Sequence, residues 1–393
     1  MFTHTLTCPY CYESFGQSEI WFRCTGRPSR HGKKCSLERD QLLEQRVGVA
    51  VPLPPAFAVN GRKMKAACPG CGGETTYCVC PACHSQLPVH FGKVKSQLVA
   101  MVGAKETGKS VYLTVLIHEL MHQVGTRFNA SVVGCDDSTR ARFSDQRARL
   151  YDSGQLLDAT RSAQAAGGVV APLVFRLTSS RNGKGRAAPE QNLFSFFDTA
   201  GEDLNSQTSV EQNTRYLASA DGIILLLDPL QMPGARALAK PGTRLPSQAT
   251  LAERPENVLS RITDLLQAQL NRPNARIKTP IAVAFSKLDA LRHDFPSGSP
   301  LRRPPSTASA FDSQDSLDVH AYIQSLLHEW GGEQIDRMLS NQYARYRYFG
   351  VSSLGEPPTA DDRVAPSGIQ PYRVPDPFLW LLSEFGAVPA TKV

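Results

Sequence analysis

The 393-residue sequence contains no apolar run that approaches 18 residues, and it does not begin with a charged stretch followed by an apolar segment. The first absence argues against a membrane-spanning helix, and the second argues against a secretory signal peptide. Cysteine is nearly absent after residue 83, where only Cys135 remains. We therefore expect a cytoplasmic, reducing setting, in which clustered cysteines bind metal instead of forming disulfides.

The other nine cysteines lie near the start of the chain, and six of them form CPxC knuckles. The last two knuckles give a CxxC-x8-CxxC spacing, which predicts a zinc ribbon with Cys68, Cys71, Cys80 and Cys83 as ligands. The first knuckle needs two more ligands. Its nearest neighbours give a second predicted site of Cys8, Cys11, Cys24 and Cys35. His31 is an alternative ligand there, and Cys78 is left over. We expect two structural zinc ions.

The excess of positive charge does not by itself indicate a nucleic-acid partner. The formal net charge is +7, and residues 1–95 carry 12 Lys and Arg against 6 Asp and Glu. Each zinc bound by four thiolates adds about −2, so two filled sites leave this region near +2. A protein partner is the favoured prediction, and nucleic acid stays open as the alternative.

A complete GxxxxGKS motif lies between an apolar run, 98–102, and a helix-forming run, 111–122. A strand that ends in such a glycine-rich turn before a helix presents backbone N–H groups to a polyphosphate. Lys109 would reach the β- and γ-phosphates, and the Ser110 hydroxyl would bind Mg²⁺. The predicted phosphate-binding residues are Gly103, Ala104, Lys105, Glu106, Thr107, Gly108, Lys109 and Ser110.

Three later apolar runs end in polar motifs that predict a guanine nucleotide. Residues 193–197 lead into Asp198-Thr-Ala-Gly201, where Asp198 would hold Mg²⁺ and the Gly201 N–H would contact the γ-phosphate. Residues 281–285 lead into Ser-Lys287-Leu-Asp289, which is similar to the guanine-binding NKxD box with Ser286 in place of Asn. The Asp289 carboxylate would accept two hydrogen bonds from guanine, which adenine does not offer. Residues 348–351 lead into Ser352, at the position of the loop behind guanine.

The order of these motifs, each after an apolar strand, resembles the translation-factor class of P-loop GTPases from residue 96 onward. The predicted fold class is α/β, with a doubly wound, mostly parallel sheet preceded by small zinc-ribbon modules. Residues 170–177 and 193–197 are expected to form an antiparallel edge hairpin. We expect a division into residues 1–90 and 96–393, with irregular inserts near 230–257 and 292–314.

Hydrolysis requires residues that contact the γ-phosphate, Mg²⁺ and the attacking water. The switch threonine has four candidates, Thr126, Thr139, Thr160 and Thr178, and the loop position of Thr160 favours it. Glu202 follows DTAG, where many GTPases have a water-orienting Gln, so we expect slow intrinsic turnover. Lys105 either adds positive charge near the bridging oxygen or points into solvent.

His118-Glu-Leu-Met-His122 matches the HExxH motif of zinc proteases, but Phe128 occupies the position of a third ligand. The motif also lies on the helix that leaves the phosphate loop. We therefore interpret these residues as part of an ordinary helix, with the protease as the rejected alternative.

Taken in order, the cysteine knuckles, VGAKETGKS, FFDTAGED and RVPDPFLWLL resemble the bacterial double-GTPase family, which is found near conflict and defence gene clusters. This resemblance implies a regulatory GTPase that binds GTP and GDP with Mg²⁺ and gates a protein effector or activator. The alternative is a zinc-ribbon adaptor whose GTPase-like domain binds nucleotide without significant turnover.

Overall fold

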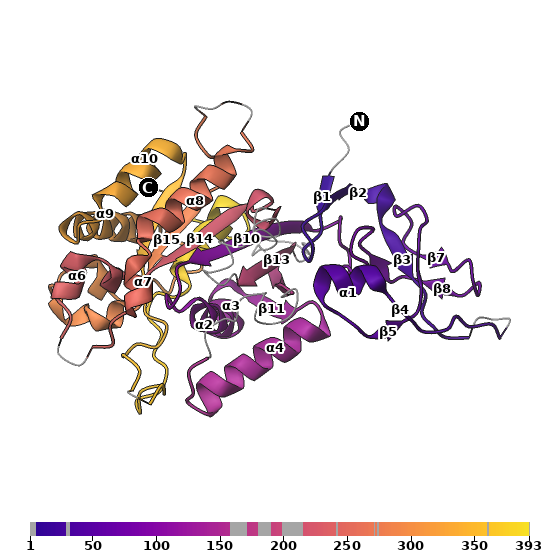
Figure 1. Cartoon of the computed structure of the whole chain (residues 1–393), viewed down its shortest axis with the longest axis horizontal. Helices are drawn as coiled ribbons and strands as arrows, with labels where there is room; N and C mark the ends of the chain where they lie inside the picture. Colours follow the sequence, from indigo (N-terminus) through magenta and orange to yellow (C-terminus); the bar gives the residue numbers. More distant parts are fainter. Residues whose placement is uncertain are drawn as a thin grey trace.

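A seven-stranded, mostly parallel sheet forms the centre of the computed structural model (Figure 1). The structure describes residues 5–28, 32–157, 171–179, 190–198, 215–240, 243–270, 272, 275–359 and 361–392. The strand order is β11-β12-β13-β10-β14-β15-β16, and the strands from β13 to β16 in this order are parallel. The strands are β10 (Lys95–Gly103), β11 (Ala130–Gly134), β12 (Leu173–Ser179), β13 (Glu190–Asp198), β14 (Gly222–Leu227), β15 (Ile281–Phe285) and β16 (Tyr346–Gly350).

Helices cover both faces of this sheet. Alternate residues of a strand point to opposite sides, and here the side chains on both sides are apolar and are buried under helices. Leu98 and Ala100 of β10 face one core, which α8 (Pro255–Gln267), α9 (Ser313–Glu329) and α10 (Glu333–Gln342) cover. Val99 and Met101 face the other core, which α2 (Lys109–Met121) and α11 (Asp376–Glu384) cover. This arrangement confirms the predicted fold class.

The edge of the sheet differs in one respect from the expected hairpin. β12 and β13 pair antiparallel, as predicted, but β11 pairs antiparallel with β12 and lies outside it. β12 is therefore an inner strand. After β11 come α4 (Asp137–Arg147) and a π-helical turn (Ala148–Asp152), while the short α3 (Gln123–Phe128) precedes it.

The regions expected to be irregular contain short helices. These are α6 (Pro233–Ala237), α7 (Gln248–Ala252) and 3-10 turns at Pro229–Gln231, Arg292–Asp294 and Pro300–Arg302, and a further 3-10 turn, Leu288–Ala290, precedes the second region. Phe295 and Leu301 are buried in the core beneath α9. Two apolar anchors therefore fix a proline- and serine-rich segment that its composition alone did not predict to pack.

The cysteine-rich module, residues 5–95, is built from very short elements. They are β1 (Thr5–Thr7), β2 (Ser14–Gly16), a 3-10 turn (Gln17–Glu19), β3 (Trp21–Arg23), β4 (Glu38–Arg39), α1 (Gln41–Val47), β5 (Pro52–Leu53), β6 (Ala56–Phe57), β7 (Ala66–Ala67), β8 (Glu74–Thr75) and β9 (Cys78–Val79). The module lies at one end of the molecule, opposite α9 and α10 (Figure 1). Its apolar cluster includes Val174 of β12 and Leu193 of β13, so module and sheet share a core.

Candidate nucleotide and metal sites

The phosphate loop connects β10 directly to α2, as the motif requires. Glu106 and Gly108 have positive φ values of 64° and 83°, which turn the chain tightly before the helix. A Cβ on Gly103 would lie 2.5 Å from the Leu226 carbonyl oxygen, so only glycine fits there. The loop therefore has the local geometry that its sequence predicts.

Lys109 and Thr107 fasten this loop from the inside. The Lys109 ammonium donates to the carbonyl oxygens of Gly103, at 2.9 Å, and Ala104, at 2.8 Å. The buried Thr107 hydroxyl donates to the Ala104 carbonyl at 2.9 Å. Lys109 is only 6% exposed, so its charge is held inside the loop and not in bulk solvent. Lys105 is exposed, which leaves both of its interpretations open.

The carboxyl ends of neighbouring parallel strands bring the other motifs to the same edge of the sheet. Asp198 ends β13 and pairs with Met101 of β10, two residues before the phosphate loop begins. Ser110 lies in the first turn of α2. A hydroxyl and a carboxylate are oxygen ligands of the kind that Mg²⁺ prefers, and the magnesium site of Ser110 and Asp198 stays a prediction. Thr160, Gly201 and Glu202 lie outside the described residues.

The guanine motif follows β15. Lys287 adopts a positive φ of 55°, and Asp289 lies in the 3-10 turn Leu288–Ala290. The Ser352 hydroxyl, after β16, donates to Asp289 Oδ1 at 2.6 Å. Burial raises the pKa of the Asp289 carboxyl, while the Ser352 hydrogen bond opposes that rise. Ser286, which replaces the usual Asn, is buried and donates through Oγ to the Leu227 carbonyl at 3.2 Å.

Asp228, which sequence reasoning missed, holds Lys287 in place at the carboxyl end of β14. Its carboxylate is 1% exposed and accepts from Lys287 Nζ at 2.7 Å and from the Leu230 N–H at 2.9 Å. The positive charge of Lys287 also lowers the pKa of Glu106 in the phosphate loop. Burial raises the pKa of Glu106, but hydrogen bonds from Ser247 and the charge of Lys287 leave it lowered overall. The signal in the sequence was Asp228 following the apolar run of β14.

The HExxH residues form a stack of rings on α2. The His118 ring lies 4.1 Å from the His122 ring and 4.2 Å from the Tyr151 ring, measured between centroids. Burial lowers the pKa of His118 to about 4. His122 Nδ1 lies 2.7 Å from the His118 carbonyl oxygen. The two imidazoles thus stack on each other, and that of His118 also stacks on Tyr151.

The cysteines form two groups of four, but the predicted grouping is wrong. One group contains Cys8, Cys11, Cys80 and Cys83, and the other contains Cys24, Cys35, Cys68 and Cys71. The two adjacent knuckles fall in different groups, and the two groups lie in different apolar clusters of the module. His31 lies outside the described residues, and Cys78 belongs to neither group.

Both groups have the dimensions of a zinc site. The Sγ–Sγ distances are 3.8 Å for Cys8–Cys83 and Cys11–Cys80, and 3.6 Å for Cys24–Cys71 and Cys35–Cys68. A tetrahedral zinc with Zn–S bonds of about 2.3 Å separates its sulfurs by about 3.8 Å. Backbone N–H groups of Tyr10 and Ala82 donate to Cys8 and Cys80 Sγ at 3.4 and 3.3 Å, which supports thiolate charge.

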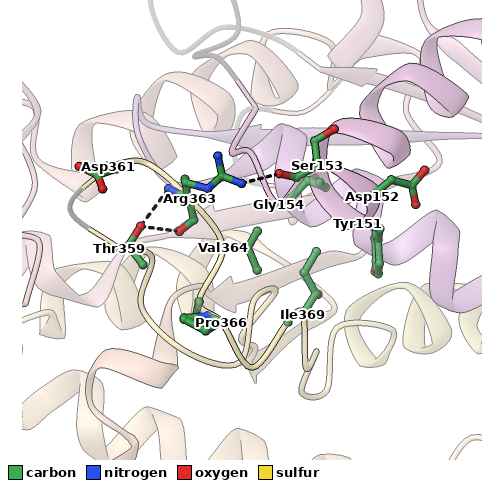
Figure 2. A pocket seen from close by; sticks show the side chains of 13 residues that line it. Tyr151, Asp152, Ser153, Gly154, Thr359, Asp361, Arg363, Val364, Pro366 and Ile369 are labelled. Atoms are coloured by element: carbon green, nitrogen blue, oxygen red, sulfur yellow. Dashed lines mark hydrogen bonds between the residues drawn. The ribbon is translucent and has the colours of Figure 1, made fainter.

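A separate pocket of about 500 Å³ lies between the π-helical turn and the loop that follows β16 (Figure 2). Arg363 donates to the Ser153 carbonyl at 2.9 Å, and the Val364 N–H donates to the Gly154 carbonyl at 2.9 Å. The residues that line this pocket include none of the predicted nucleotide-binding residues. These contacts fasten the loop beyond Ser352 to the end of α4.

In the described part of the chain, no helix combines the length and hydrophobicity needed to cross a membrane.

Comparison with known proteins agrees with this geometry. Residues 97–331 match the family model described as Double-GTPase 2. SaeC of Mycolicibacterium smegmatis, whose name assigns it provisionally to ESX-1 scaffolding and assembly, is 28% identical over 328 residues, which cover 79% of this chain and 80% of SaeC.

Among solved structures, the GTPase-like domain of Saccharomyces cerevisiae Ski7, bound to GDP and inorganic phosphate, is 15% identical with a TM-score of 0.36. That match covers 76% of this chain and 51% of the Ski7 chain, so the sequence spans about half of that structure. The small GTPase Arl6 of Trypanosoma brucei is 12% identical with a TM-score of 0.28, covering 75% of this chain and 99% of that chain.

Proposed function

Because the chain belongs to the Double-GTPase 2 family, we propose that it is a GTP-binding and GTP-hydrolysing regulatory switch whose cysteine-rich module docks a protein partner. The observation that supports this most is the position of four motifs on one edge of the sheet. The phosphate loop follows β10, Asp198 ends β13, Asp289 follows β15 and Ser352 follows β16. In an open α/β sheet, that edge is where nucleotides bind.

Guanine selectivity is proposed to come from Asp289. The carboxylate would accept hydrogen bonds from guanine N1–H and from the exocyclic amine, whereas adenine would leave it buried and unpaired. The Ser352 hydrogen bond and the neighbouring Lys287 would hold this carboxylate in its ionised form. GTP and GDP should therefore bind well ahead of ATP.

Hydrolysis is proposed to use Lys109 for charge on the transferred phosphate, Thr160 as the switch threonine and Glu202 to orient water. Mg²⁺ held by Ser110 and Asp198 would neutralise charge developing between the β- and γ-phosphates. A glutamate beside phosphate anions orients water less readily than a glutamine, so turnover without a partner should be slow.

The two cysteine groups are proposed to hold structural zinc, since four thiolates leave no open position for catalysis. Thiolate ligands require a reducing setting, which supports a cytoplasmic location. The name of SaeC gives it a scaffolding and assembly role, and this supports a protein partner for the chain described here as well.

An adaptor that binds nucleotide without turnover is the second candidate. Glu202 in place of glutamine favours it, and so does the scaffolding role in the name of SaeC. The two candidates agree on nucleotide binding and differ only in the rate of hydrolysis.

Steady-state GTP hydrolysis by metal-loaded protein, with and without proteins encoded by neighbouring genes, distinguishes the two candidates. Glu202→Ala should lower hydrolysis by about 10- to 10³-fold while GDP affinity stays nearly constant, as expected for the loss of one positioned polar group. Asp203→Ala, a change of the adjacent carboxylate, is the matched control. If Glu202→Ala leaves hydrolysis unchanged, another group or a partner holds the water, whereas wild-type protein that binds GTP without measurable hydrolysis in either condition would favour the adaptor.

A further inference from the structure

The first cysteine knuckle, Cys8 to Cys11, lies where the module meets the central sheet, and Tyr12 contacts residues of the sheet side. Tyr12 directly follows Cys11, has a positive φ of 62° and is 8% exposed. Its ring lies 6.0 Å from the Phe197 ring and 5.0 Å from the Tyr216 ring, and those two rings lie 5.0 Å apart, between centroids. The three rings therefore form one cluster, in which Tyr12 and Tyr216 are buried and Phe197 is partly buried.

The Tyr216 hydroxyl connects the two strands that carry the nucleotide motifs. It accepts from the Met101 N–H at 2.9 Å and the Phe197 N–H at 3.2 Å, and it lies 2.8 Å from the Val99 carbonyl oxygen, which can accept its proton. Met101 belongs to β10, which leads to the phosphate loop, and Phe197 to β13, which ends at Asp198. The residue whose ring Tyr12 covers thus bonds to the backbone of both paired strands.

Further contacts hold the knuckle in place. The buried Ser195 hydroxyl donates to the Pro9 carbonyl at 2.7 Å. Arg215 forms an ion pair with Glu13 at 2.5 Å, and the Ser219 hydroxyl donates to the Tyr12 carbonyl at 3.4 Å. On its other side the knuckle is anchored by Cys8 and Cys11, whose sulfurs lie 3.8 Å from those of Cys83 and Cys80.

We propose that Tyr12 is a positioning residue through which the Cys8, Cys11, Cys80 and Cys83 site sets the place of Asp198 and so favours GTP·Mg²⁺ over GDP. Phe197 immediately precedes Asp198, the predicted Mg²⁺ ligand, and Tyr12 packs on its ring. GDP would be held through the phosphate loop and Asp289, which are not part of this aromatic cluster. The inference rests on the proposed function, because it assigns a task to the same nucleotide site.

The test compares Tyr12→Ala with Tyr12→Phe, which keeps the ring. The matched control is Phe15→Ala, which removes another buried aromatic of the module, one that packs against Phe91. Affinities for GDP and for a non-hydrolysable GTP analogue with Mg²⁺ are measured by fluorescent-nucleotide titration on the full chain, together with zinc content.

Tyr12→Ala should weaken binding of the GTP analogue by about tenfold while GDP affinity changes less than about twofold, a coupling of ordinary size. Tyr12→Phe and Phe15→Ala should bind both nucleotides as the wild type does. Zinc content should stay constant in all three variants.

Equal losses for GTP analogue and GDP, or no loss for either, would overturn the positioning role. If Tyr12→Ala loses zinc or fails to fold, Tyr12→Leu retains apolar volume without the ring, and the same two affinities decide the question. Wild-type protein that binds no guanine nucleotide would refute the proposed function itself. Wild-type binding with an unchanged Tyr12→Ala would refute only this inference.

Discussion

The cysteine-rich module and the GTPase sheet are stabilised in different ways. Strands of the module are two or three residues long, whereas those of the sheet are five to nine residues long. The sheet is covered by two extensive apolar cores. In the module, cysteines make up much of the two small apolar clusters. We therefore expect metal–sulfur bonds to stabilise the module as burial of apolar side chains stabilises the sheet.

This difference determines how each region should respond to damage. A sheet whose stability is spread over many apolar contacts tolerates the loss of one polar group. A module whose short strands converge on two groups of four cysteines should lose its fold when one ligand is removed. The four predictions that follow test this comparison.

Removing metal should have the largest effect. Chelation, or Cys80→Ser, should unfold the module, because structural zinc contributes on the order of 10 kcal/mol to the folding of small domains. Elemental analysis should give two zinc ions per wild-type chain. Circular dichroism should show the loss of the module's secondary structure after chelation or in Cys80→Ser. GDP binding should survive, because the sheet is large enough to fold by itself. Abolished GDP binding would show that the sheet depends on the module for its fold.

Lys109→Ala should remove most of the triphosphate affinity without loss of zinc or of the fold, because its ammonium is held inside the phosphate loop, at the Gly103 and Ala104 carbonyl oxygens, and its removal leaves no cavity in the apolar core. Thermal melting checks this result. The wild type should gain about 2.7 kcal/mol of stability at a GTP·Mg²⁺ concentration 100 times the Kd, and the variant should gain almost none. An equal gain in both proteins would place the nucleotide elsewhere.

Asp289 should make GTP binding depend on pH. Its pKa is raised by burial, so as the pH falls through that raised value the carboxyl takes up a proton and loses its acceptors for guanine. GTP affinity should therefore fall at a higher pH than for an exposed Asp. The contribution of this group to the free energy of unfolding of the unliganded protein moves the opposite way and increases as the pH falls.

Asp289→Asn is the control for this pH dependence. The substitution should weaken GTP binding and relax the selectivity against ATP. It should also remove the contribution of this group to the pH dependence of GTP affinity and of the free energy of unfolding. A wild-type affinity for GTP that equals the affinity for ATP would overturn the guanine assignment.

His118→Ala should have the smallest effect. The side chain stacks on His122 and Tyr151 on the surface of α2, and neither cysteine group includes it. Zinc content should remain at two ions per chain, and nucleotide affinity should stay within about twofold. Loss of one zinc equivalent would revive the protease interpretation of HExxH.

The sheet was predictable from sequence because each of its motifs lies in one short segment, with its strand, loop and helix adjacent in the chain. Six of the eight predicted cysteine ligands were found for the same reason, since each CxxC knuckle is local, and Cys24 and Cys35 were added as the nearest remaining cysteines. Their grouping was not predictable, because it depends on which distant segments meet. Spacing favoured joining Cys71 to Cys80, but the fold joins Cys11 to Cys80 instead.

Contacts between the two regions were also beyond the sequence. Tyr12 and Tyr216 carry no motif, and only the fold brings their rings together. Asp228 was missed because a carboxylate after a strand is common in α/β proteins. The division into residues 1–90 and 96–393 stays a prediction, and the shared core around Val174 and Leu193 is the feature against which it is to be tested.

The two cysteine groups, which we propose to hold zinc, are nested along the chain, and this nesting has a consequence for the order of assembly. Cys35 and Cys68 are separated by 33 residues, whereas Cys11 and Cys80, which enclose them, are separated by 69. Doubling a loop adds about 0.6 kcal/mol to the entropic cost of closure. Filling the inner site first shortens the loop that the outer site must close. We expect the inner ion to load first during synthesis, while the outer site waits until Cys83 has left the ribosome.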